Sequence, residues 1–169
     1  SVGTVEQEPT SAQRLLPVAL PDLSRVHQTV RDQLRAAHAV LISGARSLET
    51  VPTDRANAFG EMGMLFMASR FPDEAQRCFR NAQQLALNDA RWPYYLGHLL
   101  KNEGDFSGAA EKFERVRQLR PTDLATLVWL GRVYLDLGQP MVAESRLREA
   151  LSVHPGQSIV QFELGRAAL

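Results

Sequence analysis

The side chains that most readily bind metals or transfer protons are too scattered in this sequence to form a catalytic centre. The 169-residue chain has one cysteine and four histidines, which are His27, His38, His98 and His154. His27 and His38 lie eleven residues apart, whereas two histidines that bind one metal from a single helix are favoured at a spacing of about four. Cys78 has no second thiol to pair with and no histidine beside it that would activate it. The sequence therefore predicts no enzyme activity, no metal site and no cofactor.

The charge balance also narrows the range of partners. Lysine plus arginine and aspartate plus glutamate both number 19, so the formal net charge is zero. Such a chain has no net field that would draw it to nucleic acid or to an anionic membrane, and neither is a predicted partner. No apolar run approaches the roughly 18 residues that indicate a transmembrane helix, so no membrane insertion is predicted either.

An apolar residue followed by glycine recurs every 34 residues through most of the chain. The four steps are Met62-Gly63, Leu96-Gly97, Leu130-Gly131 and Leu164-Gly165. Twelve residues after the first three glycines stands an alanine, and four residues later a larger apolar residue; these are Ala75, Ala109 and Ala143, then Phe79, Phe113 and Leu147. Glycine and alanine lack the side chains that would hold two crossing helices apart, so the pattern predicts closely packed pairs of antiparallel helices.

This pattern resembles that of the tetratricopeptide repeat family. Aligned on the glycine, the repeats span 56–89, 90–123 and 124–157, with a partial copy at 158–169. Pro121 and Pro155 occupy the closing position of the second and third repeats, but Leu87 stands there in the first. The resemblance implies an all-α fold, namely a right-handed superhelical solenoid of antiparallel helix pairs over 54–169. It also implies a non-enzymatic protein-binding scaffold.

Two segments precede the repeats. Residues 1–21 carry Gly3, Pro9, Pro17 and Pro21 and are predicted to be an extended arm or linker, although the apolar residues of 15–20 could pack on the solenoid. Residues 22–53 are predicted to form a packing helix and a loop, with Asp22 as the N-cap and Gly44 as the stop. Its apolar stripe consists of Leu23, Val26, Val30, Leu34, Ala37 and Leu41. The stripe either covers the end of the first repeat or forms a homodimer seam.

The proline-containing arm also looks like the lead-in of exported bacterial repeat proteins. This similarity favours a periplasmic location, while a cytoplasmic location stays open. The lone cysteine does not decide between an oxidising and a reducing compartment.

In the family that the chain resembles, ligands bind to the concave surface, which is lined mainly by the first helix of each repeat. Carried over by register, the residues predicted to bind a peptide or protein are Tyr94, Tyr95, His98, Trp129, Arg132, Phe162 and Arg166. We expect apolar anchors of the ligand on Tyr95 and Trp129, because aromatic side chains supply much of the binding energy at interfaces. We expect an acidic group or carbonyl of the ligand beside Arg132 and Arg166. The alternative is that the aromatic rings pack against the neighbouring helices.

One subclass of the family holds the C-terminal carboxylate of chaperones with lysine and asparagine at set groove positions. Here Gly60, Met64 and Tyr95 occupy three of those positions, so the clamp pattern is absent. A chaperone-tail receptor is therefore not predicted, and other modes of chaperone binding stay open.

A second functional class is a structural module that stacks on itself or on another domain of a larger parent chain. The partial repeat is expected to leave Val160, Leu164, Ala167 and Ala168 without a second helix to cover them, and such uncovered ends would allow self-association. Groove substitutions would disable an adaptor. Changes at Val160 and Leu164, or on the stripe of the preceding helix, would disable an assembly module.

Overall fold

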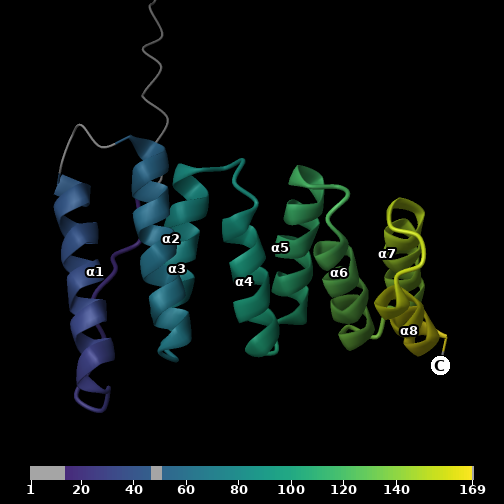
Figure 1. The fold of residues 1–169 in the computed structure, drawn as a ribbon, viewed down its shortest axis with the longest axis horizontal. Coiled ribbons are helices and arrows are strands. Elements are labelled where there is room, and N and C mark those ends of the chain that lie inside the picture. Colours follow the sequence, from purple (N-terminus) through teal and green to yellow (C-terminus); the bar gives the residue numbers. More distant parts are fainter. Residues whose placement is uncertain (1–13, 47–50, 169) are drawn as a thin grey trace, which may run out of the picture.

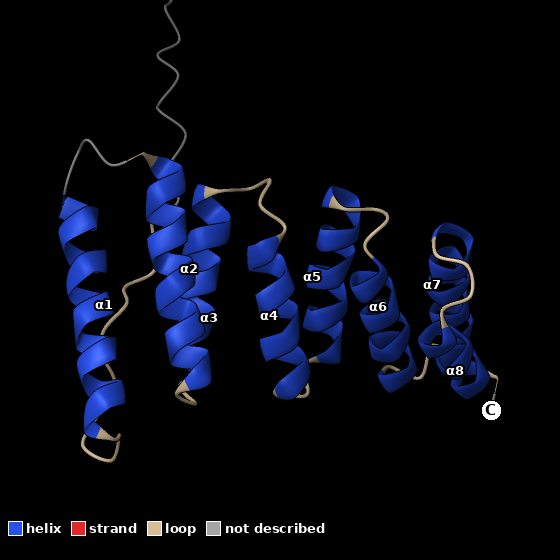
Figure 2. Cartoon of the chain, in the orientation of Figure 1, coloured by secondary structure: helices blue, strands red, loops and turns tan. Residues whose placement is uncertain are grey.

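The computed structural model describes residues 14–46 and 51–168, and these form a row of helices without a β-strand (Figure 1). The helices are α1 (Gln28–Arg46), α2 (Pro52–Ala68), α3 (Pro72–Leu85), α4 (Arg91–Asn102), α5 (Phe106–Leu119), α6 (Leu124–Asp136), α7 (Pro140–Val153) and α8 (Ser158–Ala167). Short loops join the consecutive helices from α2 to α8, and the helices stand in a row in chain order, as Figure 2 shows. The predicted all-α solenoid is confirmed.

The repeat glycines lie where two helices of one repeat cross. A Cβ atom added at Gly63, Gly97 or Gly131 would lie 2.8, 2.9 or 2.6 Å from Phe79, Phe113 or Leu147, respectively. These distances are too short for real contacts, so each glycine allows α2, α4 or α6 to approach the second helix of its pair. A Cβ at Gly165 would meet nothing within 4 Å in the described residues, so no close helix crossing involves this glycine there.

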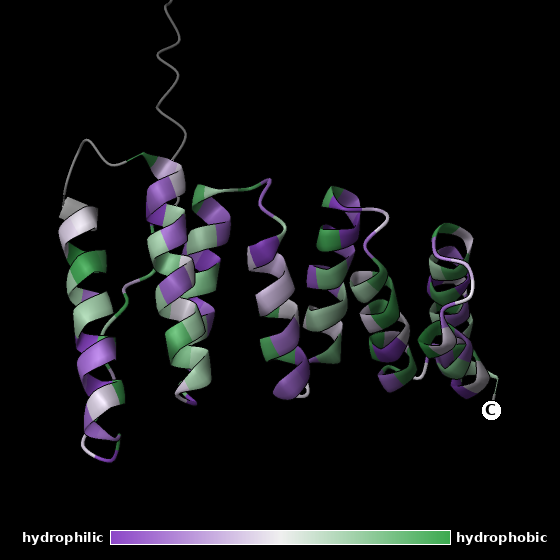
Figure 3. Cartoon of the chain, in the orientation of Figure 1, coloured by the Kyte–Doolittle hydropathy of each residue, from purple (hydrophilic) through white to green (hydrophobic). Residues whose placement is uncertain are grey.

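The core is divided among neighbouring helices. Hydrophobic and hydrophilic residues are interspersed along the helices (Figure 3), and the buried apolar residues form consecutive clusters. One cluster joins α1 through α4, a second joins α4 through α6, and a third joins α6 through α8. The apolar packing therefore continues from the two helices of one repeat to the first helix of the next, as expected for a solenoid.

The first helix differs from its prediction at both ends. It begins at Gln28 because Asp22 accepts hydrogen bonds from the backbone N–H of Ser24, at 2.9 Å, and from its hydroxyl, which closes a separate short turn. Gly44 lies within α1, so its predicted role as a stop is wrong. Glycine is tolerated inside a helix at a cost of about 1 kcal/mol, and this one has no αL conformation to end the helix.

The apolar stripe of the first helix is covered by its own chain. Leu23, Leu34 and Leu41 are buried in the cluster that includes Phe59 and Met62 of α2. In the described residues α1 thus covers the exposed side of the first repeat, and these three leucines are not available for the homodimer seam.

The arm is extended and docked along residues 14–21. The buried side chain of Asn81 on α3 accepts from the Leu16 N–H at 2.7 Å and donates to the Leu16 carbonyl at 2.8 Å. Nε2 of His38 on α1 lies 3.2 Å from the Val18 carbonyl oxygen, so this part of the arm is bonded to both helices. Residues 1–13 lie outside the described residues, and the location predicted from the arm stays a prediction.

The partial repeat is less exposed than expected. Val160 is fully buried and Leu164 is half-buried, because both pack against the cluster formed by α6 and α7. The expectation that these residues are uncovered is therefore wrong for Val160, whereas Leu164 is covered only in part. Leu169 lies outside the described residues.

The turns between paired helices share one backbone geometry. Gly104 and Gly138 have φ angles of 83° and 69°, and Arg70, one repeat earlier, has φ 63°. The left-handed region favours glycine, so Arg70 is the strained member of the set.

No helix in the ranges that the structure describes combines the length and the apolar character needed to cross a membrane.

Candidate functional site

The residues predicted to bind a ligand all lie on the first helices of their repeats. Tyr94, Tyr95 and His98 belong to α4, Trp129 and Arg132 to α6, and Phe162 and Arg166 to α8. At the start of α6 the side chain of Asp123 accepts from the Thr126 N–H at 2.8 Å, which caps that helix.

Four of these residues join into a continuous chain of ring contacts. Tyr95 stacks on Phe79 of α3 with centroids 5.1 Å apart, and it meets Tyr94 edge to face at 6.2 Å. Tyr94 contacts His98 at 4.6 Å, and His98 contacts Trp129 of α6 at 4.7 Å. These four side chains are half-buried, so one side of each ring packs on a neighbouring helix while the remainder stays accessible. The packing alternative is therefore correct for part of each ring.

His98 is not a cation at neutral pH. Burial among aromatic rings lowers its pKa below the ordinary value of 6.5, and the nearby Lys101 lowers it further. The positive charge beside the ring chain comes instead from Lys101 and Arg132, which lie 5.6 and 4.8 Å from the Trp129 ring centroid.

The two arginines expected to receive an acidic ligand already have a carboxylate partner. Arg132 donates from Nε to Glu163 Oε1 at 2.7 Å, and Arg166 donates from Nη1 to Glu163 Oε2 at 2.8 Å. Glu163 is only 1% exposed, so its charge is held inside this cluster. The positive charge expected at Arg132 and Arg166 is thus partly neutralised, since the single carboxylate of Glu163 balances one of the two guanidinium charges.

Phe162 stands apart from the ring chain. Its side chain is 63% exposed on α8, and no ring contact involves it among the described residues. It is accessible, but the structure does not bring it together with Tyr94 and Tyr95.

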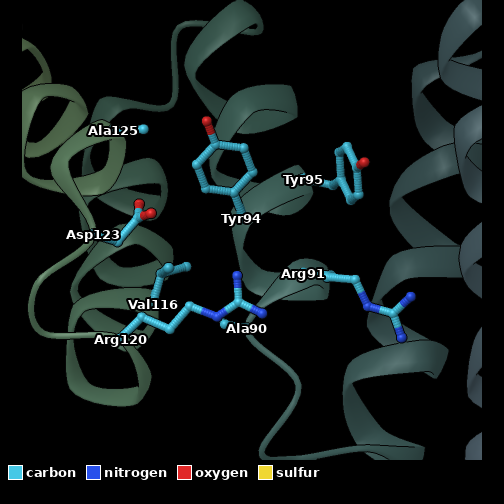
Figure 4. Close-up of a pocket in the computed structure, with 8 residues that line it drawn as sticks. All are labelled: Ala90, Arg91, Tyr94, Tyr95, Val116, Arg120, Asp123 and Ala125. Atoms are coloured by element: carbon cyan, nitrogen blue, oxygen red, sulfur yellow. The ribbon is translucent and has the colours of Figure 1, made fainter.

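A pocket of about 160 Å³ lies where the start of α4, the end of α5 and the start of α6 meet (Figure 4). Its lining residues are Ala90, Arg91, Tyr94, Tyr95, Val116, Arg120, Asp123 and Ala125. Two of the predicted residues, Tyr94 and Tyr95, therefore line a real cavity. Sequence reasoning missed Arg120, because this residue follows α5 and is not one of the groove positions of a first helix.

Most charges around this pocket are already paired. Arg91 donates from Nε to both oxygens of Asp89 at 3.0 Å, and from Nη2 to Asn57 at 2.8 Å. Hydrogen bonding to Arg91 lowers the pKa of Asp89, which therefore stays charged. Asp123 is occupied by the cap of α6. The exposed guanidinium of Arg120 forms no hydrogen bond or ion pair with any described residue.

A second, shallower hollow continues from the pocket. It is lined by Thr53, Ala86, Leu87, Asn88, Asp89, Ala90, Arg91 and Arg120. Ala90, Arg91 and Arg120 line both hollows, so the two adjoin at these residues, and we call the pair of hollows the trench.

The other chemically active groups give no second site. Burial raises the pKa of the Cys78 thiol to about 12, so it stays protonated and unreactive at neutral pH. Within 14–46 and 51–168, no three histidine, cysteine, aspartate or glutamate side chains are grouped so that they could hold a metal ion.

Comparison with solved structures supports the same fold. The crystal structure of MamA matches with a TM-score of 0.71 at 20% identity, over 90% of this chain and 84% of that one. The second tetratricopeptide repeat domain of human RPAP3, in complex with the HSP70 peptide SGPTIEEVD, matches with a TM-score of 0.65 at 16% identity, over 70% and 98%. The first such repeat of Spaghetti (RPAP3), bound to the HSP90 peptide SRMEEVD, gives 0.63 at 16%, over 69% and 92%.

The sequence comparisons cover the repeats themselves. Two family models, each described as tetratricopeptide repeat, match residues 61–123 and 100–169. No curated protein matches the chain. The matched regions overlap and together include the glycine of every repeat described above, from Gly63 to Gly165. The chain therefore belongs to the tetratricopeptide repeat family.

Proposed function

We propose that the protein is a non-enzymatic adaptor that binds an extended segment of a partner protein in the trench beside Tyr94 and Tyr95. The observation that supports this most is the pocket itself, because it presents accessible aromatic surface and unused hydrogen-bond donors at one place. Two of the similar structures are complexes with short peptides, which agrees with a peptide ligand for this fold.

The two tyrosines have different roles in this proposal. Tyr95 stacks on Phe79, which fixes its ring and lowers the entropy that a ligand must remove on binding. Tyr94 is held by His98 and by Phe113, whose ring centroid lies 5.9 Å away. A side chain of the ligand would therefore meet rigid aromatic walls, which is typical of residues that dominate binding energy.

An array of random peptides tests this proposal without a known partner. The wild type should bind a reproducible subset, and Tyr95→Ala should weaken binding to that subset by about 2 kcal/mol or more. Met141→Ala is the matched control, since Met141 is 83% exposed on α7 and lies outside the trench. Equal helicity of the variants, measured by circular dichroism, must accompany the comparison. Binding that is the same for wild type and Tyr95→Ala would contradict the proposed site.

The assembly alternative finds less support. It depended on Val160, Leu164 and the stripe of α1, and Val160 and the three stripe leucines are buried within the chain. The same variants separate the two roles, because an assembly module would tolerate Tyr95→Ala.

A further inference from the structure

We propose that the trench recognises an acidic side chain within an extended peptide, and that Arg120 is the residue that receives its carboxylate. This inference rests on the proposed function and specifies its ligand. It assigns the acid-binding role to a residue after α5, in place of Arg132 and Arg166 on the first helices.

The charged side chains around the trench are mostly already paired. The carboxylate of Asp89 is held by Arg91, and that of Asp123 accepts from both the N–H and the hydroxyl of Thr126. Among the charged side chains that line the trench, the one left without a partner in the described residues is the Arg120 guanidinium, which is a donor. A ligand that complements this surface must supply acceptors, and a carboxylate matches the planar fork of an arginine best.

Arg120 lies between the two hollows of the trench. Figure 4 shows its side chain extending from the end of α5 toward Ala90 at the start of α4. One hollow continues toward Tyr94 and Tyr95, and the other continues along the loop between α3 and α4 to Thr53. A peptide that fills both hollows has backbone on each side of Arg120. The carboxylate therefore belongs to an internal aspartate or glutamate, and not to a chain end.

Nearby carboxylates do not already form hydrogen bonds with the Arg120 guanidinium. Asp89 feels the charge of Arg120, but it forms its hydrogen bonds with Arg91. A charged donor that loses water on binding needs a charged or strongly polar acceptor in return. This requirement gives the trench a preference for acidic over neutral peptides.

The experiment uses the same random peptide array with three arginine variants. Peptides bound by the wild type should be enriched in aspartate or glutamate, and Arg120→Gln should remove that enrichment. Arg120→Lys, which keeps the charge but not the fork, should retain part of it. Arg148→Gln is the control, since it removes the same charge from an exposed side chain on α7 and should leave the enrichment unchanged.

Affinity measurements with single peptides then give the size of the effect on binding. Replacing the internal acidic residue of a bound peptide by its amide should weaken wild-type binding about tenfold or more, and should have little effect on Arg120→Gln. Amidation of the peptide's C-terminus should change little. Added salt should weaken the binding of the acidic peptide more than the binding of its amide form.

The outcomes separate the two proposals. Peptides that depend on Tyr95 but show no acidic enrichment, or an enrichment that survives Arg120→Gln, would overturn the role of Arg120 and leave the adaptor function standing. A requirement for the C-terminal carboxylate would also overturn it. If no peptide depends on Tyr95, both proposals are wrong.

Discussion

Two successive junctions between repeats have the same backbone conformation, but their side chains differ in hydrogen bonding. Arg120 ends α5 with φ −138° and ψ 76°, and His154, one repeat later, ends α7 with φ −133° and ψ 76°. Nε2 of His154 lies 2.6 Å from the Thr122 carbonyl oxygen, so its side chain is used within the fold. The Arg120 side chain has no such partner among the described residues.

The groove helices show the same contrast. At the junction of α4 with α6, Tyr94 and Tyr95 line a pocket together with Arg120, which has no ion-pair partner within the described part of the chain. At the junction of α6 with α8, Arg132 and Arg166 are closed by the buried Glu163. The repeat sets where side chains stand, but the pairing of charges differs between the two junctions, and the proposed ligand site is the one with an unpaired arginine among the described residues.

The largest effect is expected from removing Glu163, the carboxylate that pairs with both arginines at the junction of α6 with α8. Glu163→Ala leaves the half-buried Arg132 without its carboxylate partner. The unfolding free energy should fall by about 3 kcal/mol. This value is at the low end for breaking a buried ion pair, because both arginines keep some contact with water. Denaturant unfolding measures this change. Glu144→Ala is the control, since its partner Arg148 is 72% exposed, and it should cost under about 1 kcal/mol. Equal losses would show that the junction is not held by its charges.

The next effect concerns the glycines of the two junctions. Gly97→Ala forces a Cβ to 2.9 Å from the Phe113 ring, which Tyr94, His98 and Trp129 hold in place. We expect a loss of about 2 kcal/mol, typical of overpacking. Gly165→Ala meets nothing within 4 Å and should stabilise α8 by about 0.5 kcal/mol or more through helix propensity. Thermal unfolding of the two variants should show stability changes of opposite sign. A stabilised Gly97→Ala would refute the close packing.

A smaller effect distinguishes the turns of successive repeats. Arg70 has φ 63° where Gly104 and Gly138 stand in the following repeats. Arg70→Gly should raise the unfolding free energy by about 1 kcal/mol, because glycine removes the left-handed strain. The reverse change, Gly104→Arg, should lower it by a similar amount. Denaturant midpoints at constant m-value provide the measurement.

The smallest effect is a pH dependence at the open junction. The pKa of His98 is lowered in the folded chain by burial and by Lys101, so the unfolded chain binds the extra proton first as the pH falls. Its contribution to stability is complete above the ordinary pKa of 6.5 and declines below it, because stability falls wherever the unfolded state binds more protons. His98→Gln should lose less stability than the wild type between neutral and mildly acidic pH. Parallel slopes for the two proteins would contradict the burial of a neutral imidazole.

The sequence predicted the parts of this comparison that depend on repeat register. Gly63, Gly97 and Gly131 stand at helix crossings, and the predicted groove residues occupy first helices, because a fixed period repeats a fixed backbone. Register could not reveal that Glu163 turns inward to two arginines, because pairing depends on which side chains meet across a junction.

Other misses have local causes. Gly44 looked like a helix end, but its backbone stays helical and its position is not crowded by a neighbour. Val160 was predicted to be exposed because the partial repeat includes only its first helix, whereas α6 and α7 already bury this residue. Arg120 lies after a second helix, where the groove pattern assigns no contact residue.

The most direct test of the open junction is an NMR titration of the wild type with an acidic peptide recovered from the array. We follow the backbone amides together with the side-chain Nε–H of Arg120. We expect saturable shifts centred on Tyr94, Tyr95 and Arg120, and much weaker shifts with the peptide in which the acid is replaced by its amide. Shifts centred on Arg132, Phe162 and Arg166, with Arg120 unchanged, would contradict the assignment of the ligand site to this junction.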